Sequence, residues 1–163
     1  MVSRSDPKLE IMQLILEEKY PEALKKLTDI LKKEPSNKQL KMLLFDIYYN
    51  MGNVNRAVDI AIETSQFLLD EGFYDTVIGY LKKVTYYVKH PELYKILFRA
   101  LTKRRLDYEA FQSLIDFCKY AIEKHKYLKE AENFLDIVID LSPIPSLVEE
   151  AKKLKKALQT KGQ

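Results

Sequence analysis

Apolar residues return every three or four positions along most of this chain, the spacing that places them on one face of an α-helix. In residues 20–33, for example, Leu24, Leu27, Ile30 and Leu31 share a face. Long alternating runs of β-branched residues, which would indicate half-buried strands, are missing. The pattern predicts nine helices. The first begins at residue 7, and the other eight cover residues 20–33, 36–50, 54–70, 74–89, 91–104, 107–124, 127–140 and 145–159.

Capping residues and turn formers mark the ends of these helices. Asp6 before Pro7 predicts a helix start, because the carboxylate can accept unpaired N–H groups and proline loses no hydrogen bond there. Gly52 and Gly72 predict sharp helix ends, because glycine readily adopts positive φ. Three further starts are predicted at a capping box of Ser36 and Gln39, an N-cap at Asp107, and a capping box of Ser146 and Glu149.

The composition is that of a folded protein in a reducing compartment. Of the 163 residues, 47% are hydrophobic and 31% are charged, and the single cysteine, Cys118, has no partner for an internal disulfide. Acidic residues within the first thirty positions are unlike a signal peptide, and no apolar run approaches the roughly 18–20 residues of a membrane span. We therefore expect a soluble, cytoplasmic protein without membrane insertion.

A short motif recurs in the first half of the chain. An aromatic or apolar residue is followed three positions later by a small residue and then, four positions on, by another apolar or small residue. The two copies consist of Tyr20, Ala23 and Leu27, and of Val54, Ala57 and Ala61. The two copies of the small residue are 34 positions apart, which is the period of the tetratricopeptide repeat. On these residues the chain resembles that family.

Further residues extend the resemblance along the chain. In the first two repeats they are Leu14, Ile30, Pro35, Leu44, Tyr48, Gly52 and Asn53. Later ones are Tyr94, Leu97, Leu101, Ala110, Leu114, Phe117, Ala131, Leu135, Val138 and Pro143. In this second half the repeat spacing is longer than 34 residues. Ala57 precedes Ala110 by 53 residues, and Val77 precedes Ala131 by 54. The spacing indicates a longer unit of three helices.

The resemblance implies an all-α fold, a right-handed α-solenoid of antiparallel helix pairs. Phe45 and Phe98 stand where the family usually has a small residue, so the packing there is expected to be looser or rearranged. We expect one domain over residues 1–163, with repeat-like units at about 7–35, 36–90 and 91–143 and a capping helix at about 145–159.

The sequence carries no recognisable catalytic or cofactor motif. The four glycines are isolated and form no phosphate loop, and one cysteine with two histidines matches no metal-binding motif. His90 and His125 are expected near helix C-termini, where a cation complements the helix dipole. Cys118 lies in an apolar stretch and is expected to be buried. We therefore expect a protein that is not an enzyme and uses no cofactor or metal.

In the family that the chain resembles, ligand peptides lie on a concave surface formed by the first helix of each hairpin. Transferred to this sequence, that geometry predicts partner-binding residues on three of the expected helices. They are Met12, Gln39, Met42, Asp46, Tyr49, Asn50, Lys95, Arg99 and Lys103. The implied function is a scaffold or adaptor that binds a peptide or helical segment of a partner protein.

Lys95, Arg99 and Lys103 are spaced by four residues and form one stripe on a predicted helix, which we call the basic stripe. A solvated helix face and a seat for an acidic peptide are both consistent with it. Nucleic-acid binding is a further alternative, although the net charge of +3 is mild for that class. Homo-oligomerisation through exposed apolar residues such as Met12, Ile15 and Leu16 also stays open.

Overall fold

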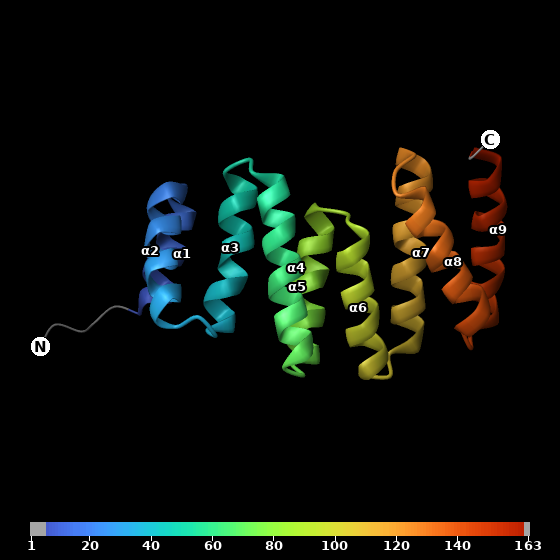
Figure 1. The fold of residues 1–163 in the computed structure, drawn as a ribbon, viewed down its shortest axis with the longest axis horizontal. Helices are drawn as coiled ribbons and strands as arrows, with labels where there is room; N and C mark the ends of the chain where they lie inside the picture. Colours follow the sequence, from blue (N-terminus) through green and yellow to red (C-terminus); the bar gives the residue numbers. More distant parts are fainter. Residues whose placement is uncertain (1–5, 162–163) are drawn as a thin grey trace, which may run out of the picture. The chain divides into compact units, whose positions relative to one another are not determined.

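The computed structural model describes residues 6–161, and this part of the chain contains α-helices and no β-strand (Figure 1). The helices are α1 (Pro7–Leu16), α2 (Tyr20–Lys33), α3 (Lys38–Asn50), α4 (Val54–Asp70), α5 (Tyr74–Tyr87), α6 (Pro91–Lys103), α7 (Asp107–Lys124), α8 (Leu128–Leu141) and α9 (Pro145–Lys161). All nine predicted helices are confirmed within these bounds. The chain divides into two compact units, Met1–Thr64 and Ser65–Gln163, and the division falls within α4.

The first unit is built from α1, α2, α3 and the first part of α4. α2 packs against both α1 and α3. Its core contains Ile11, Ala23, Leu27, Leu40 and Ile47, all buried. α4 turns back along α3, where the guanidinium carbon of Arg56 lies 5.7 Å from the ring centre of Tyr48. The small residue Ala57, in the first turn of α4, is fully buried.

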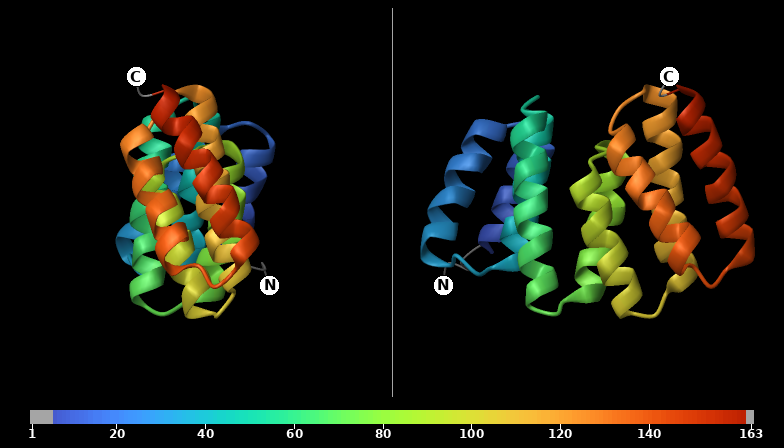
Figure 2. Two further views of the ribbon diagram at one scale, coloured as in Figure 1. Left: turned by 90° about the vertical axis from the view of Figure 1, so that its right-hand side faces the viewer. Right: turned by 45° about the vertical axis from the view of Figure 1, so that its right-hand side comes forward.

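In the second unit, helices that are neighbours in sequence pack against each other from α5 to α9, and α7 also contacts α9 (Figure 2). α7 therefore touches α6, α8 and α9. Its buried face supplies the centre of the core, including Leu114, Phe117, Cys118 and Ala121. α9 buries Leu147, Ala151 and Leu158 on one face, as expected for a helix that covers the end of a helical array.

Five of the turns share one backbone motif, in which the helix ends at a residue of positive φ. At Gly52, for example, the N–H of Gly52 donates to the carbonyl of Tyr49 and the N–H of Asn53 donates to that of Tyr48. The same two hydrogen bonds, shifted along the chain, close α1, α4, α6 and α7. In these five turns the residue of positive φ is Glu18, Gly52, Gly72, Arg105 or His125. The two glycine turns were predicted from the sequence, and the other three were not.

Replacing His125 by glycine is expected to stabilise the protein by about 0.5–1 kcal/mol. His125 has a φ of 55°, where a side chain is strained by its own backbone and glycine is not. Its side chain is exposed, so little packing is lost. Urea denaturation measures the change, and His125→Ala, which keeps the Cβ atom, is the matched control. Equal stability of the two variants would contradict this explanation.

Three predicted helix starts were wrong in detail. α3 is capped by Asn37, whose Oδ1 accepts a hydrogen bond from the N–H of Leu40 at 3.1 Å, so Ser36 lies outside the helix. The cap position of α7 is Leu106, and Asp107 is the first helical residue. α9 begins at Pro145, which places Ser146 inside its first turn. The cap positions of α3 and α7 lie one residue from the predicted ones and that of α9 lies two residues away, within the usual uncertainty of helix ends.

His90 also differs from its prediction. Its Nδ1 accepts a hydrogen bond from the N–H of Glu92 at 3.1 Å, so it caps the N-terminus of α6 instead of complementing a C-terminal dipole. The extended backbone that precedes Pro91 makes this geometry available. His125, by contrast, lies directly after the C-terminus of α7.

The helix starts repeat with an offset of 53 or 54 residues. α3 and α4 begin 53 residues before α6 and α7, and α5 and α6 begin 54 residues before α8 and α9. The turns follow the same offset, because Gly52 precedes Arg105, and Gly72 precedes His125, by 53 residues. A unit of three helices therefore recurs in the secondary structure as well as in the sequence.

Candidate functional site

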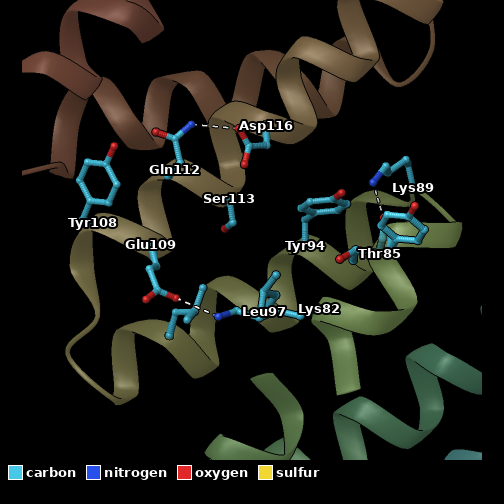
Figure 3. Close-up of a pocket in the computed structure, with 12 residues that line it drawn as sticks. Lys82, Thr85, Lys89, Tyr94, Leu97, Tyr108, Glu109, Gln112, Ser113 and Asp116 are labelled. Carbon is cyan, nitrogen blue, oxygen red and sulfur yellow. Dashed lines mark hydrogen bonds and ion pairs between the residues drawn. The ribbon is translucent and has the colours of Figure 1, made fainter. Parts of the chain in front are cut away.

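A groove of about 390 Å³ lies on the second unit, between α5 and α7 and over α6 (Figure 3). We call it the α5–α7 groove. Its lining residues are Lys82, Thr85, Tyr86 and Lys89 on the α5 side, Tyr94, Leu97 and Leu101 on α6, and Tyr108, Glu109, Gln112, Ser113 and Asp116 on α7. The volume falls within the range of pockets that take up small ligands or a few side chains.

The two walls of the groove carry opposite charges. Lys82 and Lys89 lie seven residues apart on the α5 side, and Glu109 and Asp116 lie seven residues apart on α7. We call these the basic wall and the acidic wall. Lys82 Nζ reaches across to Glu109 Oε2 at 3.2 Å (Figure 3). Both side chains of this ion pair are about half exposed, so it contributes little to stability and opens easily.

The other end of the groove is more buried and polar. Burial raises the pKa of the Tyr94 hydroxyl to about 12, and the carboxylate of Asp116 adds to this effect. Asp116 in turn accepts a hydrogen bond from the Gln112 amide at 2.9 Å. Lys89 donates to the backbone carbonyl of Thr85, and partial burial lowers its pKa although Asp116 opposes the change. At this end, Lys89 and Asp116 therefore each have a hydrogen-bond partner on their own side of the groove.

The floor and rim of the groove are apolar and aromatic. Tyr94, Leu97 and Leu101 follow the face of α6 that points into it and are nearly covered by their neighbours. At the rim, Tyr86 is 78% exposed and Tyr108 is 57% exposed. Exposed tyrosine beside an apolar floor is common at recognition surfaces, because the ring packs and the hydroxyl stays hydrated.

A smaller groove of about 190 Å³ occupies the equivalent place in the first unit, between α2 and α4. Leu31 and Pro35 precede Thr85 and Lys89 by 54 residues. Lys41, Leu44, Ile60 and Glu63 precede Tyr94, Leu97, Ser113 and Asp116 by 53 residues. The groove is therefore a product of the three-helix unit, and the larger copy differs in having Tyr94 where the smaller has Lys41.

Six of the predicted partner-binding residues lie on the first unit. Met12 is exposed on α1, and Gln39 and Asn50 are exposed at the two ends of α3. Met42, Asp46 and Tyr49 are half-buried on α3, and the Tyr49 ring stacks on the buried Phe45 with ring centres 5.7 Å apart. Asn50 uses its amide to hydrogen bond the carbonyl of Asp46 at 2.7 Å. None of these six lines the groove of the first unit.

The basic stripe lies on α6, and its three side chains are exposed. Successive residues of a helix are rotated by 100°, so Lys95, Arg99 and Lys103 point away from the face that carries Leu97 and Leu101. Lys95 is paired with Glu92 at 3.0 Å. The stripe therefore lies outside the α5–α7 groove, and part of its charge is compensated.

Sequence reasoning missed the walls of the groove. Tyr94, Leu97 and Leu101 had been identified as repeat residues, but Lys82, Lys89, Glu109 and Asp116 had not been singled out. The available signal was the seven-residue spacing of like charges on two helices. That spacing does not reveal that the two charged faces oppose each other.

Cys118 is fully buried, as predicted, and its Sγ donates a hydrogen bond to the carbonyl of Ala131 at 3.3 Å. Burial raises the pKa of the thiol to about 12. Because the thiolate is the reactive form, alkylation by iodoacetamide at pH 8 is expected to be at least about a hundredfold slower than in the urea-denatured protein. Mass spectrometry of the alkylated fraction over time measures both rates. Similar rates would show that the site opens readily.

Among residues 6–161, no group of three or more His, Cys, Asp or Glu side chains is placed to hold a metal ion. No helix in the same range is both long enough and apolar enough to cross a membrane.

Comparison with known families gives a match in the first part of the chain. Residues 14–65 match the family model of the tetratricopeptide repeat. No curated protein and no solved structure matches the chain. The match and the helical architecture of the described residues fit a helical-repeat protein of tetratricopeptide type, a class of protein–protein interaction module.

Proposed function

We propose that this protein is a non-catalytic, cytoplasmic adaptor that binds a short segment of a partner protein in the α5–α7 groove. The observation that carries the proposal is the combination, in one groove, of an apolar floor, exposed Tyr86 and Tyr108 at the rim, and two charged walls. The tetratricopeptide repeat at residues 14–65 supports a protein-binding role, by analogy between folds.

The walls and floor of the groove define which side chains the partner segment must carry. An apolar side chain suits the groove, because it can pack against the exposed rings of Tyr86 and Tyr108 above a floor formed by Leu97 and Leu101. Acidic groups match Lys82 and basic groups match Glu109, since each wall has a single sign of charge. A partner segment of mixed charge therefore fits better than a uniformly acidic one. An acidic peptide bound by Lys95, Arg99 and Lys103 is a separate prediction, on another face of α6.

Selection of peptides from a random display library on the immobilised protein tests the proposal. We expect the selected peptides to lose at least tenfold in affinity, about 1.4 kcal/mol, when Tyr86→Ala and Tyr108→Ala are combined. Both rings are exposed, so folding is preserved. Leu141→Ala is the control, because Leu141 is 67% exposed at the end of α8 and does not line the groove.

A second variant separates the groove from the basic stripe. Replacement of Lys95, Arg99 and Lys103 by glutamate is expected to leave binding of these peptides unchanged. Loss of binding in this variant alone would move the site to the outer face of α6. Selected peptides that bind the Tyr86/Tyr108 variant as tightly as the wild type would contradict the proposed groove.

A further inference from the structure

α1 carries an apolar stripe that its own unit does not cover. Leu9, Met12 and Leu16 are 62%, 40% and 83% exposed. Their spacing of three and four residues puts them on one side of the helix, whereas Ile11 is fully buried in the core shared with α2. Three large apolar side chains exposed in a row on a ten-residue helix indicate a surface that is covered by something else.

Charged side chains of opposite sign flank this stripe. By helical geometry, Lys8 lies on one side of it, and Gln13 and Glu17 lie on the other. The Gln13 amide donates to the Glu17 carboxylate at 3.3 Å, which holds the acidic flank in place. α1 therefore presents an apolar ridge between a basic flank and an acidic flank.

The α5–α7 groove has the complementary arrangement and the same length. The stripe spans seven residues from Leu9 to Leu16, which is about 10.5 Å along a helix. The acidic wall from Glu109 to Asp116 and the floor from Tyr94 to Leu101 each span seven helical steps as well. An apolar ridge with flanks of opposite charge thus meets an apolar floor between walls of opposite charge.

We propose that α1 of one copy of this protein docks through Leu9, Met12 and Leu16 in the α5–α7 groove of a second copy. The basic flank of α1 then faces the acidic wall, and its acidic flank faces the basic wall, which fixes one of the two directions along the groove. Lys8 then forms an ion pair with a carboxylate of α7, and Glu17 forms one with a lysine of the α5 side. The exposed pairs Lys82–Glu109 and Lys19–Glu17 open to allow this, at small cost.

Pairing of two α1 helices with each other is the competing arrangement. In an antiparallel pair the like flanks meet, so that the Lys8 sides face each other and the Glu17 sides face each other. In a parallel pair, Lys8 and Glu17 are separated by more than two turns and do not meet. The charge pattern of α1 therefore favours the groove over a second α1.

The contact joins two different surfaces, so it is heterologous. The assembly retains one unoccupied α1 stripe and one unoccupied groove, so further copies can add. We expect the average mass measured by sedimentation velocity to rise with protein concentration beyond that of a dimer. A mass that stays monomeric at the highest attainable concentration would overturn the proposal.

One variant of each surface tests the contact. Leu16→Glu replaces the most exposed residue of the apolar stripe by a charge, and it is expected to raise the apparent dissociation constant at least tenfold. Combining Lys82→Glu with Glu109→Lys exchanges the wall charges and is expected to weaken assembly to a similar extent. Leu141→Glu is the matched control, because Leu141 is a 67% exposed leucine at the end of α8, outside both surfaces, and should assemble like wild type.

Mixing the two defective variants decides the geometry. The Leu16→Glu protein keeps an intact groove, and the wall-exchange protein keeps an intact α1, so the mixture is expected to form one contact and stop at a dimer. Failure of the mixture to associate, or assembly that survives Leu16→Glu, would overturn the proposal. Peptide binding is read separately on the monomeric Leu16→Glu variant, so the self-association and the proposed adaptor function can fail independently.

Discussion

Replacing Phe117 by alanine is expected to lower the free energy of unfolding by about 3–5 kcal/mol, because it leaves a cavity in the core of the second unit. The ring is fully buried, and four aromatic rings surround it. The ring centres of Tyr94, Phe134, Tyr127 and Tyr120 lie 5.0, 5.3, 5.9 and 6.3 Å from its own. These rings come from α6, α7, α8 and the residue before α8, so the one side chain connects three helices.

Urea denaturation followed by circular dichroism measures this effect. Tyr86→Ala is the control for loss of an aromatic side chain, and it is expected to change stability by less than about 0.5 kcal/mol, because Tyr86 is mostly exposed. Phe117→Leu is expected to lose less than Phe117→Ala, since leucine fills part of the cavity. A loss below about 1 kcal/mol in Phe117→Ala would mean that the surrounding rings collapse into the space.

The second large effect is expected from Ala57→Leu in the first unit, with a loss of about 1–3 kcal/mol through overpacking. Ala57 is fully buried in the first turn of α4, directly after the turn at Gly52 that returns the chain along α3. A leucine side chain there has to push the two helices apart or leave its preferred rotamer. The repeat motif places a small residue at this position for the same reason.

Asn55→Leu is the matched control for Ala57→Leu, because it adds the same side chain two residues away on the exposed side of the same turn. Its effect on stability is expected to stay within about 0.5 kcal/mol. Thermal and urea unfolding compare the two variants. If both lose the same free energy, the cause is leucine in the first turn of α4 rather than close packing against α3.

The turns show how far local sequence determines the hairpins. Gly52 and Gly72 predict a positive φ, because only glycine adopts it without strain. Glu18, Arg105 and His125 take the same conformation with no such signal in their side chains. At these positions the packing of the two flanking helices outweighs a local cost of about 1–2 kcal/mol per residue.

The predicted binding residues illustrate the limit on the functional side. The basic stripe was found because Lys95, Arg99 and Lys103 follow one helix face, and the structure does place them together on the exposed side of α6. The α5–α7 groove lies on the opposite side of the same helix and takes its walls from Lys82 and Glu109, which are 27 residues apart in sequence. No local pattern links these two residues.

The sequence by itself therefore determined the helices, the two glycine turns, the repeat motif with its small residues, and the burial of Cys118. These follow from backbone periodicity and local conformational preference, which act over a few residues. Only the tertiary structure decided which helix faces oppose each other. The rotation of α5 and α7 about their axes depends on their packing against α6, which joins residues about 20–30 positions apart in sequence. That packing creates the groove and places its two charged walls opposite each other.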